Sequence, residues 1–155
     1  GIGFDAHIAH EFAKYGKRGF QSYIKVVLRE LRKYKRQRII LKTDEQTIDK
    51  EVFLVSFANG SQYGNNAVIA PNANIQDGMM DIVIIHKLSV IGVIQIAYQM
   101  FRGTLKNSSF FQLIKTRKAE IIQHYSFAHI DGEPIMPGNK INIDVRPLSL
   151  NMIVP

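Results

Sequence analysis

Carboxylates set in short turn motifs are the side chains of this sequence best suited to chemistry. In Asp131-Gly132-Glu133, two carboxylates stand two positions apart, directly after the apolar segment 127–130. A positioned carboxylate can accept or orient the proton of a hydroxyl group, which is the role of a general base. Asp-Gly is also a common turn sequence, so a plain turn with a solvated Glu is the alternative interpretation.

Three further motifs precede this one in the chain. They are Gly3-Phe4-Asp5-Ala6, Asn59-Gly60 followed by Tyr63-Gly64-Asn65-Asn66, and Ile69-Ala70-Pro71-Asn72-Ala73 followed by Asp77-Gly78-Met79-Met80-Asp81. Each is weak alone, because Asn-Gly and Asp-Gly pairs mostly mark turns. Their order and spacing together resemble the second half of the diacylglycerol kinase catalytic family, which includes bacterial lipid kinases and sphingosine kinases. The resemblance covers nearly all of the 155 residues.

This resemblance implies a kinase built from two domains. In that family an N-terminal α/β domain binds ATP through a Gly-Gly-Asp-Gly-Thr motif, and the active site lies between it and a β-sandwich domain. Neither that motif nor a Gly-x-x-x-x-Gly-Lys-Ser/Thr loop occurs in this sequence, which also opens without an initiator Met. We therefore expect residues 1–155 to be the C-terminal domain of an ATP-dependent lipid kinase, cut from its nucleotide-binding domain and inactive alone. The substrate would be diacylglycerol or a sphingoid-type lipid.

The resemblance also assigns roles to individual residues. Asp131 and Glu133 match the acidic residues that act on the lipid hydroxyl or contact the nucleotide, and which of the two is the base stays open. Asp5 matches an acid that meets the lipid head group, with His7 as a weaker neighbour. The alternative for Asp5 is the cap of a following helix. His7 and His10 are otherwise expected to be ordinary histidines, since no further ligand stands at metal-binding spacing.

A structural Mg²⁺ is implied at the loop that contains Asp77-Gly78-Met79. The resemblance places one ligand on the Asp77 side chain and the others on the backbone carbonyls of Asn74 and Met79. Hard oxygen ligands of this kind suit Mg²⁺, and a simple Asp-Gly turn is the alternative. Asn65 and Asn66 replace a Gly-Gly pair of the family. Because Asn tolerates positive φ, we expect the turn there to form.

Basic residues concentrate in one segment of the chain. Residues 14–42 contain eleven Lys and Arg against the single acid Glu30, within a net charge of +7. Lys25, Arg29, Arg32 and Lys33 lie off the apolar stripe of a predicted helix and would face an anionic membrane surface. A solvated helix face is the alternative. With so many more cations than acids, the segment is not expected to be neutralised by salt bridges. The sequence also shows no pattern of aromatic residues for stacking on bases, so nucleic acid is not indicated as a partner.

Hydrophobic periodicity predicts the elements that position these motifs. Helices are expected at 20–34 and at 89–101, the second capped by Ser89 and ended by Gly103. Strands are expected at 37–42 and 50–57, which form a hairpin, and at 67–70, 81–87, 118–124, 127–130, 140–145 and 149–154. The fold class is α+β, mainly β, as an antiparallel β-sandwich with two flanking helices.

Composition narrows the classes of protein further. Apolar residues make up 46% of the chain, enough for a core, and the absence of Cys excludes disulfides and thiolate metal sites. No apolar run reaches the roughly 18–20 residues of a membrane span. We expect a cytoplasmic, membrane-peripheral protein. The competing hypotheses are a non-catalytic basic module that binds membranes or nucleic acid, and half of an NAD or polyphosphate-type kinase.

Overall fold

Alternation of apolar and polar residues produces a sheet of four strands. The computed structural model describes residues 1–16, 19–86 and 88–151, without the side chains of Phe20 and Asn107. The sheet has the antiparallel order β12 (Lys140–Asp144), β9 (Lys118–Gln123), β2 (Gln37–Thr43) and β3 (Thr47–Val52). Ile39, Leu41 and Ile121 are buried, whereas their neighbours along the strands are more exposed. One face of this sheet therefore supplies half of a core.

A second sheet of six antiparallel strands packs against it. Its order is β11 (Glu133–Ile135), β10 (Ala128–Ile130), β1 (Ile2–Gly3), β4 (Leu54–Ala58), β7 (Met80–Ile85) and β8 (Phe111–Thr116). All six residues of β7 are buried. Ile82 and Ile84 face the four-stranded sheet, whereas Val83 and Ile85 belong to a second core on the opposite face. Burial on both faces explains why residues 82–85 of β7 form a continuous apolar run.

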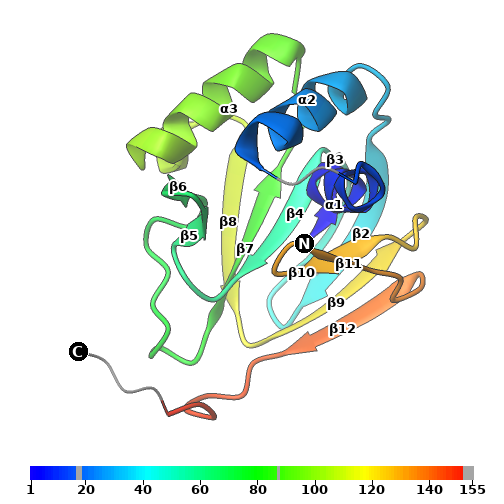
Figure 1. Ribbon diagram of the computed structural model, residues 1–155. Helices are drawn as coiled ribbons and strands as arrows, with labels where there is room; N and C mark the ends of the chain where they lie inside the picture. The colour runs from blue at the N-terminus through cyan, green and yellow to red at the C-terminus, as the bar shows by residue number, and fades with distance from the viewer. Residues whose placement is uncertain (17–18, 87, 152–155) are drawn as a thin grey trace.

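Helices cover the far face of the six-stranded sheet (Figure 1). They are α1 (Phe4–Lys14), α2 (Phe20–Leu31) and α3 (Val90–Arg102), followed by a short 3-10 turn, η1 (Leu105–Asn107). Ser89 Oγ accepts a hydrogen bond from the Gly92 amide at 3.1 Å, and Gly103 ends α3 at φ 65°. These are the start and stop signals that the sequence predicts for this helix. The strands β5 (Gln62–Gly64) and β6 (Ala67–Val68) form a separate two-stranded hairpin between β4 and β7 in the sequence.

The predicted fold class is confirmed, whereas the structure differs from the prediction in some of its elements. The segment 50–57 is not one strand: β3 ends at Val52 in one sheet and β4 begins at Leu54 in the other. The chain passes from one sheet to the other at Phe53. The Phe53 amide donates a hydrogen bond to the Ile85 carbonyl oxygen, and the Phe53 carbonyl oxygen accepts one from the Phe4 amide at 2.9 Å. No strand forms at 149–151, where the exposed chain has no sheet partner, and 152–154 lie outside the described residues. The helix α1 adds a third helix to the two that were predicted.

Candidate active site

Asp5 is held inside the protein by the tight start of α1. Gly3, at φ 97°, is the residue before this helix, and a Cβ there would stand 2.7 Å from the Leu54 Cα. Only glycine allows this close approach to β4. Asp5 is consequently placed in the first turn, with 5% of its side chain exposed. The cap position belongs to Gly3, so Asp5 is not the helix cap; its Oδ1 accepts from the Ala6 amide at 2.8 Å.

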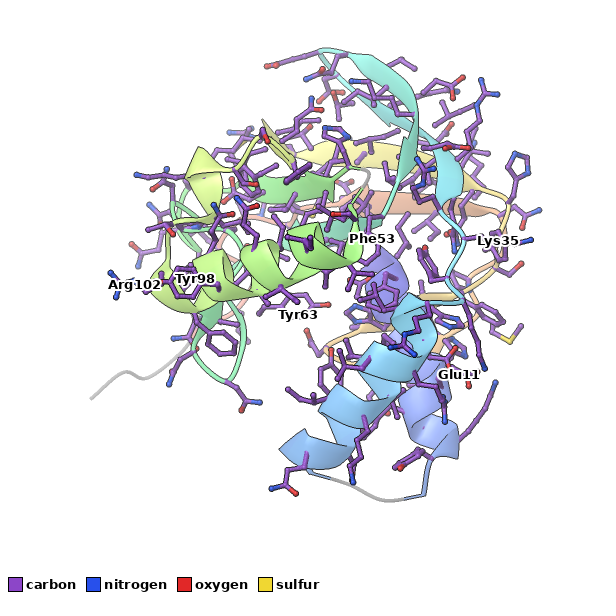
Figure 2. The ribbon with its side chains drawn as sticks, turned by 90° about the horizontal axis from the view of Figure 1, so that it is seen from above. Glu11, Lys35, Phe53, Tyr63, Tyr98 and Arg102 are labelled. Atoms are coloured by element: carbon purple, nitrogen blue, oxygen red, sulfur yellow. The ribbon has the colours of Figure 1, made fainter. Side chains whose placement is uncertain are left out.

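The other oxygen of Asp5 joins two distant parts of the chain. Oδ2 accepts a hydrogen bond from the Tyr63 hydroxyl at 3.0 Å and lies 3.0 Å from Nε2 of His129. Tyr63 comes from β5 and His129 from β10. Two of the motifs noted in the sequence therefore meet at one buried carboxylate, together with His129 from the strand before a third; we call this group the Asp5 cluster (Asp5, Tyr63, His129). In Figure 2, Tyr63 lies between helices α2 and α3.

His129 also connects this cluster to the Asp131-Gly132-Glu133 turn. The Gly132 amide donates to Nδ1 of His129 at 3.3 Å, so that nitrogen acts as an acceptor. Nε2 is then the ring nitrogen that can donate to Asp5. His129 thereby links Asp5 to the turn.

The Asp131-Gly132 pair forms the tight connection between β10 and β11. Asp131 has φ 49° and Gly132 has φ 85°, and Ile130 pairs with Glu133 across the hairpin. Two successive residues at positive φ are the geometry of a two-residue hairpin turn. Asp131 and Glu133 are both exposed. Asp131 and Gly132 therefore form a turn, which leaves two carboxylates on the surface beside a buried one.

Tyr63 and the turn that follows it support the cluster from the β5–β6 hairpin. Burial raises the pKa of the Tyr63 hydroxyl well above its usual value, and the negative charge of Asp5 adds to the effect. The phenol therefore stays protonated and donates to Asp5 at physiological pH. Asn65 and Asn66 have φ 46° and 63°, so the predicted Asn-Asn turn forms as expected.

Sequence reasoning missed Tyr63 and His129 as members of the site. Tyr63 stands inside one of the quoted motifs, and His129 precedes Asp131 by two positions, so adjacency to the motifs is the one signal that could have found them. From the sequence alone, His129 is expected to be an ordinary histidine like the other four (His7, His10, His86, His124), because no metal-ligand spacing includes it. Its partner Asp5 is 124 positions away in the sequence.

His7 contacts a different carboxylate. Its Nε2 lies 3.0 Å from Oε2 of Glu30, and Arg29 Nε donates to Oε1 of Glu30 at 2.6 Å. Hydrogen bonds from Arg29 and His7 lower the pKa of Glu30 below its usual value. This group joins α1 to α2, and no hydrogen bond connects it with the Asp5 cluster among the described residues. A substrate role for His7 stays a prediction.

The loop predicted to bind Mg²⁺ already holds a cation of the protein itself. Asp77 Oδ1 accepts from the Met79 amide at 2.9 Å, and Asp77 Oδ2 contacts Nζ of Lys115. Asn74 uses its side chain to accept from the Gln76 amide at 2.9 Å. No three His, Asp or Glu side chains gather as a metal site within the part of the chain that the structure describes. With Lys115 in this place, the loop does not fit a divalent ion.

The basic segment is more extensively paired than its composition suggests. Most of its acidic partners come from elsewhere in the chain: Arg36 pairs with Glu51, Arg38 with Asp49, Lys42 with Glu120, and Arg29 with Glu11 as well as with Glu30 of the segment itself. These basic residues do form salt bridges, so the expectation from the sequence is wrong for them. Lys25, Arg32 and Lys33 form no ion pair within residues 1–16, 19–86 and 88–151. Of the four predicted membrane-facing cations, these three are the ones without an ionic partner there.

Two shallow hollows lie on the outer face of the four-stranded sheet. One is lined by charged residues that include Lys42, Glu120 and Asp144, and the other by Arg38, Asp49 and His124. Neither shares a residue with the Asp5 cluster. The convergence of sequence motifs, and not the shape of these hollows, marks the candidate site.

Comparison with known families identifies the domain. The sequence model of the YegS C-terminal NAD kinase beta sandwich-like domain matches residues 1–154. The chain belongs to this family. The match extends from β1 through the last described strand, β12, so this YegS C-terminal domain includes every motif discussed above.

Individual relatives of this YegS C-terminal domain are named as kinases. A protein of Shewanella frigidimarina (strain NCIMB 400) named "Probable lipid kinase YegS-like" is 27% identical over 114 residues, which are 73% of this chain and 36% of that protein. A solved structure of a diacylglycerol kinase from Bacillus anthracis str. Sterne superposes with a TM-score of 0.59 at 21% identity, over 96% of this chain and 52% of that one. The structural likeness shows the fold. The chain spans about a third to a half of the length of these proteins.

Proposed function

We propose that this domain is the C-terminal part of an ATP-dependent lipid kinase that phosphorylates a lipid hydroxyl, of diacylglycerol or a sphingoid-type lipid. The observation that carries the proposal is the hydrogen-bonded path from Asp5 through His129 to Gly132. It joins two motifs of the lipid kinase resemblance, and the Tyr63 hydrogen bond to Asp5 brings a third to the same place. Family membership and the names of the relatives support the same activity.

Each carboxylate receives a distinct role in this proposal. Asp131 or Glu133 accepts the proton of the lipid hydroxyl, because both are exposed at the tip of the β10–β11 hairpin. Glu133 also contacts the nucleotide. Asp5 recognises the lipid head group, helped by Tyr63, whose oxygen can accept a hydrogen bond from a ligand while its proton stays on Asp5. His7 is the weaker neighbour in this role.

A nucleotide-binding domain of the same protein is the partner that we propose. Phosphoryl transfer depends on holding the phosphates and neutralising their charge. The chain contains neither a Gly-Gly-Asp-Gly-Thr motif nor a Gly-x-x-x-x-Gly-Lys-Ser/Thr loop that would supply such a cradle. ATP with Mg²⁺ is the cofactor of the whole protein in this proposal, and the isolated domain has no kinase activity. Nucleic acid is not a partner.

A membrane surface is the second partner, and the helical layer supports it. Helix α3 has buried residues on its inner face and exposed apolar residues on its outer face: Val90, Ile91, Ile94, Tyr98 and Phe101. Ile91 is 77% exposed and Tyr98 64%. The unpaired cations Lys25, Arg32 and Lys33 belong to the neighbouring α2 region, on the same side of the molecule (Figure 2). Exposed apolar side chains beside cations are typical of proteins that lie on anionic membranes.

A bilayer contact of this kind would be peripheral. No helix among the described residues is long and apolar enough to cross a membrane. We propose a cytoplasmic protein that reaches its substrate by surface contact, with the apolar residues entering the headgroup region and the cations resting on anionic lipids.

The deciding experiment is a kinase assay on the full-length protein with labelled ATP. The acceptors are diacylglycerol, sphingosine and NAD in parallel reactions. Phosphorylation of one lipid, lost in Asp131→Asn or Glu133→Gln, is the expected result. Phosphorylation of NAD instead would assign the protein to the soluble-substrate kinases that the family description names. No turnover of ATP with any acceptor, together with vesicle binding, would indicate a non-catalytic membrane module.

A further inference from the structure

The strand register places a lysine directly opposite a buried aspartate. Lys115 on β8 pairs with Asp81 on β7, and β8 is the edge strand of the six-stranded sheet. Side chains on one strand alternate between faces, so Asp81 shares the face of Val83, which belongs to the helix-side core. A carboxylate in that position is costly unless something compensates its charge.

Asp81 lacks a hydrogen-bond partner at one of its oxygens. Its side chain is 3% exposed, and Oδ1 has no donor within hydrogen-bonding distance among the described residues. Nζ of Lys115 lies 3.9 Å from this oxygen, which is an ion-pair distance and too long for a hydrogen bond. Burial raises the pKa of Asp81, and the charge of Lys115 opposes that shift. The buried oxygen thus points toward a cation that it does not bond directly.

The same ammonium group binds the loop that precedes β7. Lys115 Nζ contacts Asp77 Oδ2, and the Met79 amide occupies Asp77 Oδ1. Both oxygens of Asp77 are therefore engaged by groups of the protein. A divalent ion at Asp77 would have to displace Lys115 or stand beside its positive charge.

We propose that the Lys115 ammonium is the resident cation of the Asp77–Asp81 carboxylate pair, in the place where the lipid kinase resemblance puts Mg²⁺. It joins the loop 74–79 to the edge of the six-stranded sheet and compensates the buried Asp81. The loop then keeps its shape without a divalent ion, and its stability does not depend on the Mg²⁺ concentration. This inference concerns the fold of the domain and does not rest on the proposed kinase activity.

Thermal unfolding of the full-length protein tests the proposal without an activity readout. The Tm is measured in EDTA and in excess MgCl₂, with no nucleotide present, for the wild type and for Asp77→Asn. The wild type should show no Mg²⁺-dependent increase in Tm beyond that of Asp77→Asn. A Mg²⁺-dependent increase that Asp77→Asn removes would overturn the proposal, and this comparison does not require a Lys115 variant to fold.

Replacement of Lys115 by an uncharged residue should make the Tm of the protein depend on Mg²⁺. In EDTA, Lys115→Met should lower the Tm by about 5 °C, because Asp81 is left without its cation. MgCl₂ should recover part of this loss in Lys115→Met and none in Lys115→Met combined with Asp77→Asn. An unchanged Tm of Lys115→Met in EDTA, or the absence of any recovery by Mg²⁺, would show that Lys115 is not in the cation position.

Lys42 offers a matched control for this substitution. It also faces a carboxylate directly across two antiparallel strands, Glu120 on β9, with Nζ and Oε1 at 3.1 Å. That pair lies on the surface, where an ion pair contributes little. Lys42→Met should change the Tm by less than about 2 °C and should show no response to MgCl₂. A loss as large as that of Lys115→Met would mean that the effect comes from losing any cross-strand lysine.

Discussion

Nε2 of His129 lies 3.0 Å from Oδ2 of Asp5, although the two residues are 124 positions apart in the chain. Because Nδ1 of the same ring accepts from the Gly132 amide, His129 holds both the buried carboxylate and the exposed turn. It is a positioning residue in the proposed kinase, since it acts through Asp5 and through the turn.

His129→Leu should therefore lower kcat of the full-length kinase by about 10²-fold, as a small misplacement of reacting groups does. His129→Gln keeps an N–H donor for Asp5 and should recover much of this loss. His124→Leu, which removes a histidine on the outer face of the four-stranded sheet, is the matched control and should leave kcat unchanged. Equal activity of His129→Leu and wild type in steady-state assays would show that His129 does not position groups of the active site.

The acidic turn should be essential for turnover and dispensable for folding. Asp131→Asn is the informative variant, because Asn tolerates the positive φ of 49° that Ala would strain. Asp131→Asn or Glu133→Gln should reduce kcat by roughly 10²–10⁴-fold, as expected for loss of a general base. Calorimetry should show a Tm within about 2 °C of wild type, since both side chains are exposed. Full activity in both variants would move the base to the nucleotide-binding domain.

The sequence predicts the elements of this fold best where a local pattern is unambiguous. The alternation of Ile39 and Leu41 identifies β2, and Ser89 with Gly103 marks the ends of α3. The crossing at Phe53 was missed because 52–58 is almost continuously apolar, and such a run does not reveal where the chain changes sheets. At the site, the motifs contain Asp5, Tyr63 and Asp131, but the contact between Tyr63 and Asp5 spans 58 positions and is visible only in the fold. Tertiary contacts of this range leave no local signal.

The hydrogen bonds of Glu30 with Arg29 and His7, which join α1 to α2, predict that the stability of the domain depends on pH. The pKa of Glu30 is lowered by Arg29 and His7, so its contribution is fully present above the ordinary Glu pKa of about 4.3 and is lost as the pH falls through the lower folded-state value. Glu30→Gln should cost about 1–2 kcal/mol of unfolding free energy at pH 7, because a charge-assisted hydrogen-bonding partner is lost. Urea unfolding from pH 3 to pH 7 measures this difference.

The cost of Glu30→Gln should shrink as the pH falls below about 4, because the carboxylate is protonated first in the unfolded state and then, at its lowered pKa, in the folded state. Glu51→Gln is the control, since Glu51 pairs with Arg36 on the surface and its side chain is 60% exposed. Its effect should stay within about 0.5 kcal/mol at every pH. A cost of Glu30→Gln that is independent of pH would show that the carboxylate charge does not contribute.

Vesicle binding should depend on both the charge and the apolar surface of the helical layer. Reversal of Lys25, Arg32 and Lys33 to Glu should weaken binding to phosphatidylserine vesicles at least tenfold at low salt, with a smaller effect at high salt. Arg29 is left in place because it bonds to Glu30. Replacement of Ile91, Ile94 and Tyr98 by Ser should weaken binding at every salt concentration, because their contribution is burial of apolar surface.

A matched charge reversal tests whether position matters for that binding. Arg117, Lys118 and Arg146 are exposed cations near the β8–β9 connection, on the opposite end of the molecule from α2 and α3 (Figure 1). Their reversal to Glu changes the net charge equally and should weaken binding much less. Equal losses in the two triple variants would mean that net charge alone attracts the protein to vesicles.

Strand β7 has a consequence for how the domain opens. Its six buried residues supply side chains to the core between the sheets and to the core beneath the helices, and it has a hydrogen-bonded neighbour on each side. β7 cannot leave one core without also leaving the other, so we expect local fluctuations at the edges, such as β11 and the β5–β6 hairpin. In native-state hydrogen exchange, the amides of β7 should exchange only through global unfolding. The hairpin that carries Tyr63 can then open for a ligand at a free energy well below that of the domain as a whole.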